Sequence, residues 1–338
     1  MIVLNRYNKN NVLFQWFMCL FLFLIASFSL KANAVDYSPN QVFSQVHYAN
    51  QLAKELLEQK GINNYVLPSS REKQAKPMHV YELHVSVLSE LYNYAQSLGF
   101  RPPPIVVSTP ISYKPTDVYY LSQLAVSKLK EIHSAKLGSN QVQLRTFQNK
   151  TPSMVYQEIF LLYYRLNLLN GKSKISPSEV FSHTIRIKED LQRILSTLAR
   201  RIEHSEENER KKRLLTTAVF GTHPDGSSMG SKPTDKKPSD VIELSFQIRK
   251  QLNLLRARYN MPTIAIPNST NYNKILPVDV FLQTQFIIAE INLLKQPMSI
   301  SSTTNRGHRY VDKTPSNVYY EMQHIKYMLD RLISLRTH

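Results

Sequence analysis

Two short stretches of the sequence have a residue spacing that is typical of catalysis or nucleotide binding. Residues 226–230 read Gly-Ser-Ser-Met-Gly, which fits the Gly-x-Ser-x-Gly turn that holds a nucleophilic serine between a strand and a helix. A polar segment without a strand-like run precedes it, so we expect no serine hydrolase. Residues 171–173 read Gly-Lys-Ser, but Leu166 stands where a phosphate-binding loop requires glycine, so we expect no bound nucleotide.

The histidines and carboxylates are not spaced for metal binding or acid–base catalysis. On the helices expected below, His47, His84, His183 and His324 stand at +8, +7, +6 and +9 from a proline, so they share no position. No His-x-x-x-His pair places two imidazoles on one side of a helix. Carboxylates share a position only near helix starts, where capping explains them. We therefore predict no catalytic, cofactor-binding or metal-binding residue, and no enzymatic activity.

An internal repeat determines where every side chain is placed. In eight places a proline is followed three residues later by valine, and the next residue is aromatic in seven of them. The sequence numbers of successive prolines differ by 38, 38, 37, 25, 61, 39 and 38, which indicates a repeat architecture. The repeats begin at Pro39, Pro77, Pro115, Pro152, Pro177, Pro238, Pro277 and Pro315.

The pattern after each proline predicts a helix. Apolar residues recur 10, 14 and 17 positions after the proline in all eight repeats, counting Tyr94 as apolar. Together with the valine they lie on one stripe of a helix with 3.6 residues per turn. Each repeat is therefore predicted to contain one helix of ~20 residues.

The residues at both ends of this pattern are typical of helix termini. Proline suits the first position of a helix, because the amide it lacks would have no acceptor there. We expect Tyr37 and Tyr113, two residues before the proline, to pack on the valine of their own helix as a hydrophobic staple. Four repeats have a capping carboxylate at the third helical position: Asp117, Glu179, Asp240 and Asp279. Four helices are expected to end in a left-handed glycine: Gly61, Gly99, Gly138 and Gly171.

The linkers leave most of the helix topology open. Linkers of about 16 residues could reach ~53 Å, more than a helix length, so neighbouring helices can be parallel or antiparallel. The segment 171–176 is too short for a return, and we expect the helices of repeats four and five to form an antiparallel hairpin. The fold class predicted is all-α, an array of about eight helices in a bundle or solenoid, joined by long, partly extended linkers. The unit differs from the tetratricopeptide repeat, which has about 34 residues and two helices.

The composition predicts four segments in the chain. Residues 1–34 resemble a signal peptide, with Arg6 and Lys9 before an apolar run and Ala-Asn-Ala at 32–34; an uncleaved anchor is the alternative. Residues 35–216 hold repeats one to five, with helix five extended through the charged run 203–213. Residues 217–237 are expected to be a flexible linker, and residues 238–338 hold repeats six to eight.

Charge and cysteine usage give the expected location and partners. The only cysteine, Cys19, lies in the segment 1–34, so the remaining chain has no disulfide; it has 39 basic and 25 acidic residues and a net charge of +14. We expect an exported protein, periplasmic or secreted on the assumption of a bacterial source, without a stable membrane span after cleavage. The function predicted is a non-enzymatic helical-repeat scaffold that binds a protein or an anionic component of the cell envelope. The alternative is a periplasmic sensory domain that holds a small molecule between helices lined by Tyr92, Tyr94, Tyr163 and Tyr164.

Overall fold

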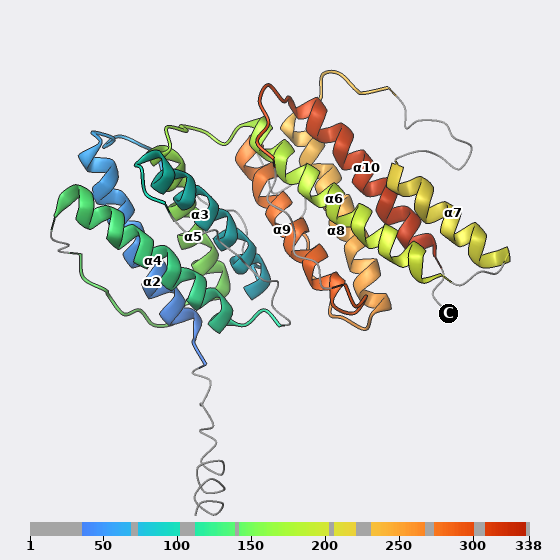
Figure 1. Ribbon diagram of the computed structural model, residues 1–338, viewed down its shortest axis with the longest axis horizontal. Helices are drawn as coiled ribbons and strands as arrows, with labels where there is room; N and C mark the ends of the chain where they lie inside the picture. Colours follow the sequence, from blue (N-terminus) through green and yellow to red (C-terminus); the bar gives the residue numbers. More distant parts are fainter. Residues whose placement is uncertain are drawn as a thin grey trace, which may run out of the picture. The chain divides into compact units, whose positions relative to one another are not determined.

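Every proline of the repeat is the first residue of a helix. Figure 1 shows these helices coloured along the sequence. The computed structural model describes residues 36–68, 74–101, 112–138, 142–202, 206–220, 231–267, 274–300 and 308–335. Within these ranges it has nine α-helices and no strand, which confirms the all-α fold class. The eight repeat helices are α2 (Pro39–Gln59), α3 (Pro77–Ser97), α4 (Pro115–Leu137), α5 (Pro152–Leu169), α6 (Pro177–Arg201), α8 (Pro238–Arg258), α9 (Pro277–Lys295) and α10 (Pro315–Ser334).

The predicted end signals work as expected at most helices. The carboxylates of Asp117, Asp240 and Asp279 accept a bond from the backbone N–H of the residue before their proline, each at 2.8 Å. All four predicted glycines have a positive φ, between 73° and 84°, which favours glycine. Local sequence therefore defines where the helices begin and, in four cases, where they end.

The helices pack as two rings of four. In the first bundle α2 packs on α4 and α5, and α3 packs on the same two helices. In the second bundle α6 packs on α9 and α10, and so does α8. The order around each ring is therefore first, third, second and fourth helix, so the second bundle repeats the topology of the first.

All four helices of a bundle run in the same direction. Contacts between α2 and α5 join Asn40 to Lys150, His47 to Glu158 and Lys60 to Leu169, with sequence separations of 110, 111 and 109. A constant separation along two helices requires that they be parallel. The linkers must then return along the outside of the bundle, and the arm 142–150 does so over α2, where Phe147 packs on Phe43 and His47.

The apolar columns form the core of both rings. The residues 3, 10, 14 and 17 positions after each proline are all buried, with at most 5% of their surface exposed. Residues 37–338 form one compact unit. Among the described residues no helix is long and apolar enough to cross a membrane.

The helices of repeats four and five run antiparallel as expected, but the prediction that they pack against each other as a hairpin is wrong. Helix α5 packs against α2 and α3, whereas α6 packs against α9 and α10, so each joins a different bundle. The short segment 171–176 turns the chain round, but it does not decide which helix each one packs against. The two bundles meet instead through α3 and α9. These two helices are antiparallel, because His79 lies by Glu290 and Ser86 bonds Gln285.

The expected extension of helix five to residue 216 is also wrong. Helix α6 ends at Arg201, and Ile202 has an extended backbone with ψ 124°. A separate helix, α7 (Glu206–Phe220), folds back against α6 and α10. It buries Leu215 and Ala218, which a straight continuation of α6 would carry away from the core. Of the expected linker 217–237, residues 217–220 belong to α7 and residues 221–230 lie outside the described part.

Candidate functional site

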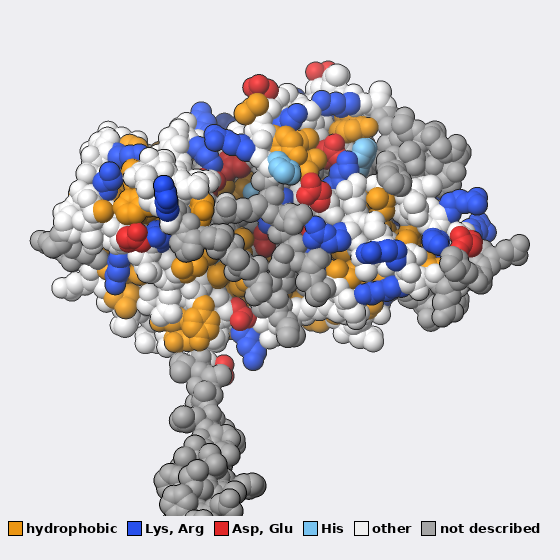
Figure 2. All heavy atoms as spheres, viewed as in Figure 1, with side chains coloured by type: hydrophobic (Ala, Val, Ile, Leu, Met, Phe, Trp, Pro, Cys, Tyr) orange, Lys and Arg blue, Asp and Glu red, His pale blue; other side chains and the backbone are white. Residues whose placement is uncertain are grey.

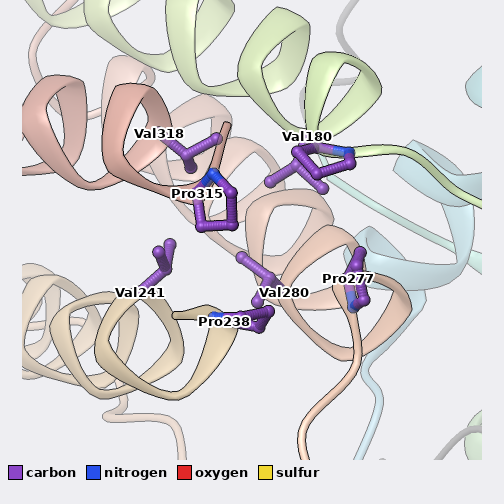
Figure 3. Close-up of a pocket in the computed structure, with 8 residues that line it drawn as sticks. Val180, Pro238, Val241, Pro277, Val280, Pro315 and Val318 are labelled. Atoms are coloured by element: carbon purple, nitrogen blue, oxygen red, sulfur yellow. The ribbon is translucent and has the colours of Figure 1, made fainter. Parts of the chain in front are cut away.

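The repeated Pro-x-x-Val sequences converge at one end of each bundle. Four prolines and four valines, one pair from each helix, surround a small hollow on the axis of the second bundle (Figure 3). The first bundle has the same arrangement, and the two hollows measure ≈ 10 and ≈ 20 Å³. That is room for about one water molecule. The lining side chains carry no donor, acceptor or charge, so the hollows give a polar ligand no side-chain partner.

Hydrogen bonds join neighbouring helix starts at several places around each ring. The backbone N–H two residues before a proline donates to the side chain one residue after the proline of the next helix. Five such bonds join described residues at 2.7–3.4 Å: Tyr37 to Thr116, Lys150 to Asn40, Ala75 to Ser153, Lys236 to Ser316 and Lys313 to Ser178. They run in the same direction around both rings, so a neighbouring helix holds five of the eight helix starts in place.

The aromatic residue of the motif takes part in the same contact. The side chain two residues before one proline packs on the aromatic ring of the next helix. Tyr37 stacks on Tyr119 with ring centroids 3.6 Å apart, and Tyr113 meets Tyr81 edge-on at 5.4 Å. Lysines do the same: the amines of Lys150, Lys236 and Lys313 lie over Phe43, Tyr319 and Phe181 at 4.3, 4.6 and 5.1 Å. The expected staple within one helix is therefore corrected, because Tyr37 and Tyr113 pack on the neighbouring helix.

A buried network of charges lies where the two bundles meet. Glu290 on α9 binds Arg249 at 2.9 Å and Arg256 at 3.4 Å, and His79 of α3 lies 3.6 Å away. All four side chains are almost fully buried. Burial alone would raise the pKa of Glu290, but the two guanidinium groups hold it at about 2. Burial lowers the pKa of His79 to about 4, so the imidazole is neutral near pH 7.

Two more buried ion pairs extend this network. Glu82 of α3 binds Arg186 of α6 at 3.0 Å, and Asp190 of α6 binds Lys295 of α9 at 2.9 Å. Burial raises the pKa of Glu82 and lowers that of Lys295, and each partner opposes the shift. Removing one partner of such a pair leaves an uncompensated buried charge, which destabilises the packing of the helices that hold it. We read the network as the element that fixes α3 against α6 and α9.

Two acidic residues of this network, Asp190 and Glu290, stand at one position of the repeat, which lies beside an apolar column. Thirteen residues after the proline, next to an apolar column, six of eight repeats have a charged or amide side chain: Glu90, Lys128, Arg165, Asp190, Gln251 and Glu290. Five of these are buried, and Lys128 is partly exposed. Each has a polar partner, for example Glu90, whose carboxylate binds Lys172 at 2.8 Å. A search limited to apolar columns misses this position.

The stretches that resemble catalytic motifs do not come together with this network. The Gly-x-Ser-x-Gly sequence 226–230 lies outside the described residues. The lysine of Gly-Lys-Ser is Lys172, which is bound to Glu90. In the described ranges, no group of three or more His, Cys, Asp or Glu side chains is arranged to hold a metal ion.

The four tyrosines considered for a ligand pocket do not line either hollow. The Tyr163 hydroxyl donates to Glu179, and the Tyr164 hydroxyl donates to the carbonyl of Ser173. The amine of Lys60 lies over the ring of Tyr94 at 5.2 Å. These three side chains serve contacts between helices and turns.

Comparison with known proteins gives no match: no family model, no curated sequence and no solved structure is similar to the chain.

The exposed surface is strongly basic. In the part of the chain that the structure describes, 19 lysine and arginine residues are exposed, against eight aspartate and glutamate residues. The ratio of basic to acidic residues is higher on this surface than in the full sequence, which has 42 and 25, because buried ion pairs such as Glu82 with Arg186 and Asp190 with Lys295 remove both signs in equal numbers. Figure 2 shows lysine and arginine side chains spread over one face of the molecule. This surface can attract an anionic partner.

Proposed function

We propose that the protein is a non-enzymatic, exported helical scaffold that binds an acidic protein or an anionic polymer of the cell envelope. The observation that carries this proposal is the exposed charge, 19 basic residues against eight acidic ones in the described ranges. The repeated residues are used for helix starts, ring contacts and the core. The surface is what differs between repeats, and it is where a repeat protein ordinarily reads its partner.

The alternative, a sensory domain for a small molecule, receives no support from the described residues. A ligand site requires a cavity of ~300 Å³ or more, and the two hollows hold about one water each. The tyrosine hydroxyls that could orient a ligand bind protein groups instead.

The salt dependence of binding tests the proposal. Fluorescently labelled poly-glutamate serves as the probe, and poly-lysine of the same length is the control. Salt screens charges over ~30 Å at 0.01 M and over ~3 Å at 1 M, so the affinity for poly-glutamate should fall steeply between these concentrations. Material from the envelope fraction should compete with the probe. An affinity that ignores salt, or equal binding of the two polymers, contradicts the proposal.

Export is tested separately, at the amino terminus. Residues 1–34 lie outside the described part of the chain, and removal after Ala34 would leave Val35 as the first residue. Intact mass spectrometry of the protein from a cell fraction measures this directly. A chain that keeps Met1 argues against cleavage and for the anchor.

A further inference from the structure

The outer face of α9 is covered by the first bundle. We define the α9 face as Leu282, Gln285, Phe286 and Ala289, which stand at positions +5, +8, +9 and +12 from Pro277. All four are at most 3% exposed. Phe286 stacks on His79 of α3 at 3.9 Å, and the hydroxyl of Ser86 donates to Gln285 at 3.1 Å. This face is thus a helix-to-helix interface between the two bundles.

The same positions of α4 form a face that is exposed to solvent, although Tyr37 meets Tyr120 edge-on with ring centroids 6.0 Å apart. We define the α4 face as Tyr120, Gln123, Leu124 and Ser127, which stand at the same four positions from Pro115. All four are exposed, and Tyr120 and Leu124 show 58% and 46% of their surface to solvent. Glutamine occupies the eighth position on both faces, and a large apolar side chain the ninth. Helix α4 is the third helix of its ring, as α9 is of the other.

The partner side of the interface also has an exposed counterpart. On α3, the second helix of its ring, Glu82 and Ser86 stand at positions +5 and +9 from the proline and are buried between the bundles. The equivalent positions of α8, the second helix of the other ring, are Glu243 and Gln247, and both are exposed. We define the α8 face as Glu243, Gln247 and Lys250. The glutamate at the fifth position is common to both helices.

We propose that the α8 face of one molecule binds the α4 face of a second copy, in the way that α3 binds α9 within the chain. Inside the chain the second helix of one ring meets the third helix of the other, antiparallel. Repeating this step places Gln247 beside Gln123 of the second copy, as Ser86 lies beside Gln285. The two faces differ, so the contact is head-to-tail: it closes into a small ring or continues as a chain, depending on the rotation between copies.

Disulfide trapping tests the pairing of the two faces. The chain that begins at residue 35 contains the whole compact unit and no cysteine, so introduced thiols react without background. Gln123→Cys and Gln247→Cys are made separately, mixed and oxidised mildly, with Gln143→Cys, an exposed residue of an arm, as the control. Disulfides need Cα atoms within about 7 Å. We expect the mixed Gln123→Cys and Gln247→Cys dimer to dominate. Cross-links that form equally with the control, or in each variant alone, overturn the proposal.

Charge placed on the α4 face tests the contact without a cross-link. Leu124→Arg should weaken self-association roughly tenfold or more, since it puts a cation at the position that Phe286 fills in the chain. Met154→Arg is the matched control, because Met154 is also an exposed apolar residue on a helix, 42% accessible. Sedimentation velocity over a range of concentrations measures both. A parent protein that stays monomeric throughout, or equal losses in the two variants, overturns the proposal.

Salt separates this contact from binding of an anionic partner. Two copies of a chain with net charge +14 repel each other, so added salt should strengthen self-association. The proposed binding of a polyanion weakens under the same change. Self-association that falls with added salt contradicts this proposal without touching the other one.

Discussion

Single residues at both ends of each bundle offset the alignment of its helix dipoles. Four parallel helices direct about half a positive charge each to one end and half a negative charge each to the other. Asp240 and Asp279 stand in the first turn of their helices. At the opposite end Arg258 donates to the carbonyls of Leu332 and Leu335, and the Lys60 amine donates to that of Leu169. Acidic side chains thus lie at the positive, amino-terminal ends of the helix dipoles, and basic side chains lie at the negative, carboxyl-terminal ends.

The ring of valines makes a prediction about stability. Val280 is 2% exposed and lines the hollow of the second bundle. Val280→Asp should lower the free energy of unfolding by ~3–5 kcal/mol, because it buries a carboxylate with no partner on the hollow. Val311→Asp is the control; this valine is 69% exposed in a linker, and its change should stay within ~0.5 kcal/mol. Chemical denaturation measures both, and equal stabilities would contradict the assignment of the core.

His84 predicts how stability depends on pH. This side chain is fully buried, and neither ring nitrogen has a hydrogen-bond partner among the described residues. Burial lowers its pKa from 6.5 to about 3. Below pH 6.5 the His84 side chain is protonated in the unfolded chain, whereas in the folded protein it stays neutral down to about pH 3. The free energy of unfolding is therefore not reduced by His84 above pH 6.5. It falls between pH 6.5 and about pH 3, by up to ~1.4 kcal/mol per pH unit.

The variant His84→Phe should flatten this pH dependence. His79 and His183 shift in the same direction, and Glu82, whose pKa is raised, acts in the opposite direction near pH 4.5. The variant should therefore keep part of the loss. Denaturation at about pH 7 and about pH 5 measures the difference in slope. A slope equal to that of the parent protein would mean that His84 takes up a proton in the folded state.

At the scale of elements, the sequence predicts the helix starts to the residue and leaves their packing open. Proline, the valine column and the capping carboxylates act within one helix, so their effect can be predicted from the local sequence. The parallel direction of the helices is not, because linkers of this length permit either direction. Helix α7 is predicted only as an extension of the preceding helix, because the charged run 203–213 contains no proline or glycine that would mark a break; Leu215 and Ala218, which give the segment a face to bury, follow that run.

The inter-bundle network was missed for a related reason. Glu290 and its partners Arg249 and His79 come from three helices, α9, α8 and α3, and only the packing of both rings brings them together. The aligned repeats show that the position thirteen residues after the proline is polar, but they do not show which residue each of these side chains binds. The ring contacts were hidden in the same way, since Tyr37 and Tyr119 belong to different repeats.

The linker between α7 and α8 makes a prediction at this scale. Lys232 is exposed, and residues 231–237 are not helical, so mild trypsin should cut within the expected linker 217–237 first. The two fragments should then stay together, because the part before the cut contains α6, which packs on α9 and α10 of the other part. Denaturing gels should show two fragments while gel filtration shows one species. First cuts inside residues 239–256, or fragments that separate, would contradict the packing.

The whole molecule repeats one design twice. Four consecutive repeats close a ring, and the next four close a second ring with the same order of helices. The two irregular spacings of the repeat lie at and just after this change. The short one, from Pro152 to Pro177, joins the bundles, and the long one, from Pro177 to Pro238, lies within the second ring and holds α7. The division of the chain expected from composition falls at 217–237, whereas the packing divides it between α5 and α6.

Two pairs of fragments decide between these divisions. A break between Lys172 and Ser173 leaves two complete rings, 35–172 and 173–338. The face of α3 that this break exposes bears His79, Glu82 and Ser86, which water can solvate, so the first fragment should stay soluble. A break in the linker yields 35–216 and 238–338, and removes α6 from the ring that its Ile187 and Leu191 help to fill.

We expect the first pair to fold separately and the second pair to fold poorly. Each complete ring keeps its apolar columns and its helix-start contacts, so both fragments of the first pair should show helical circular dichroism and a cooperative melt. Residues 238–338 have three helices and an open core, which should give low helicity or aggregation. Mixing the first pair should restore a complex, because the pairs of Glu82 with Arg186 and of His79 with Glu290 join the two rings. If 238–338 folds alone and 35–172 does not, the chain is divided at the linker instead.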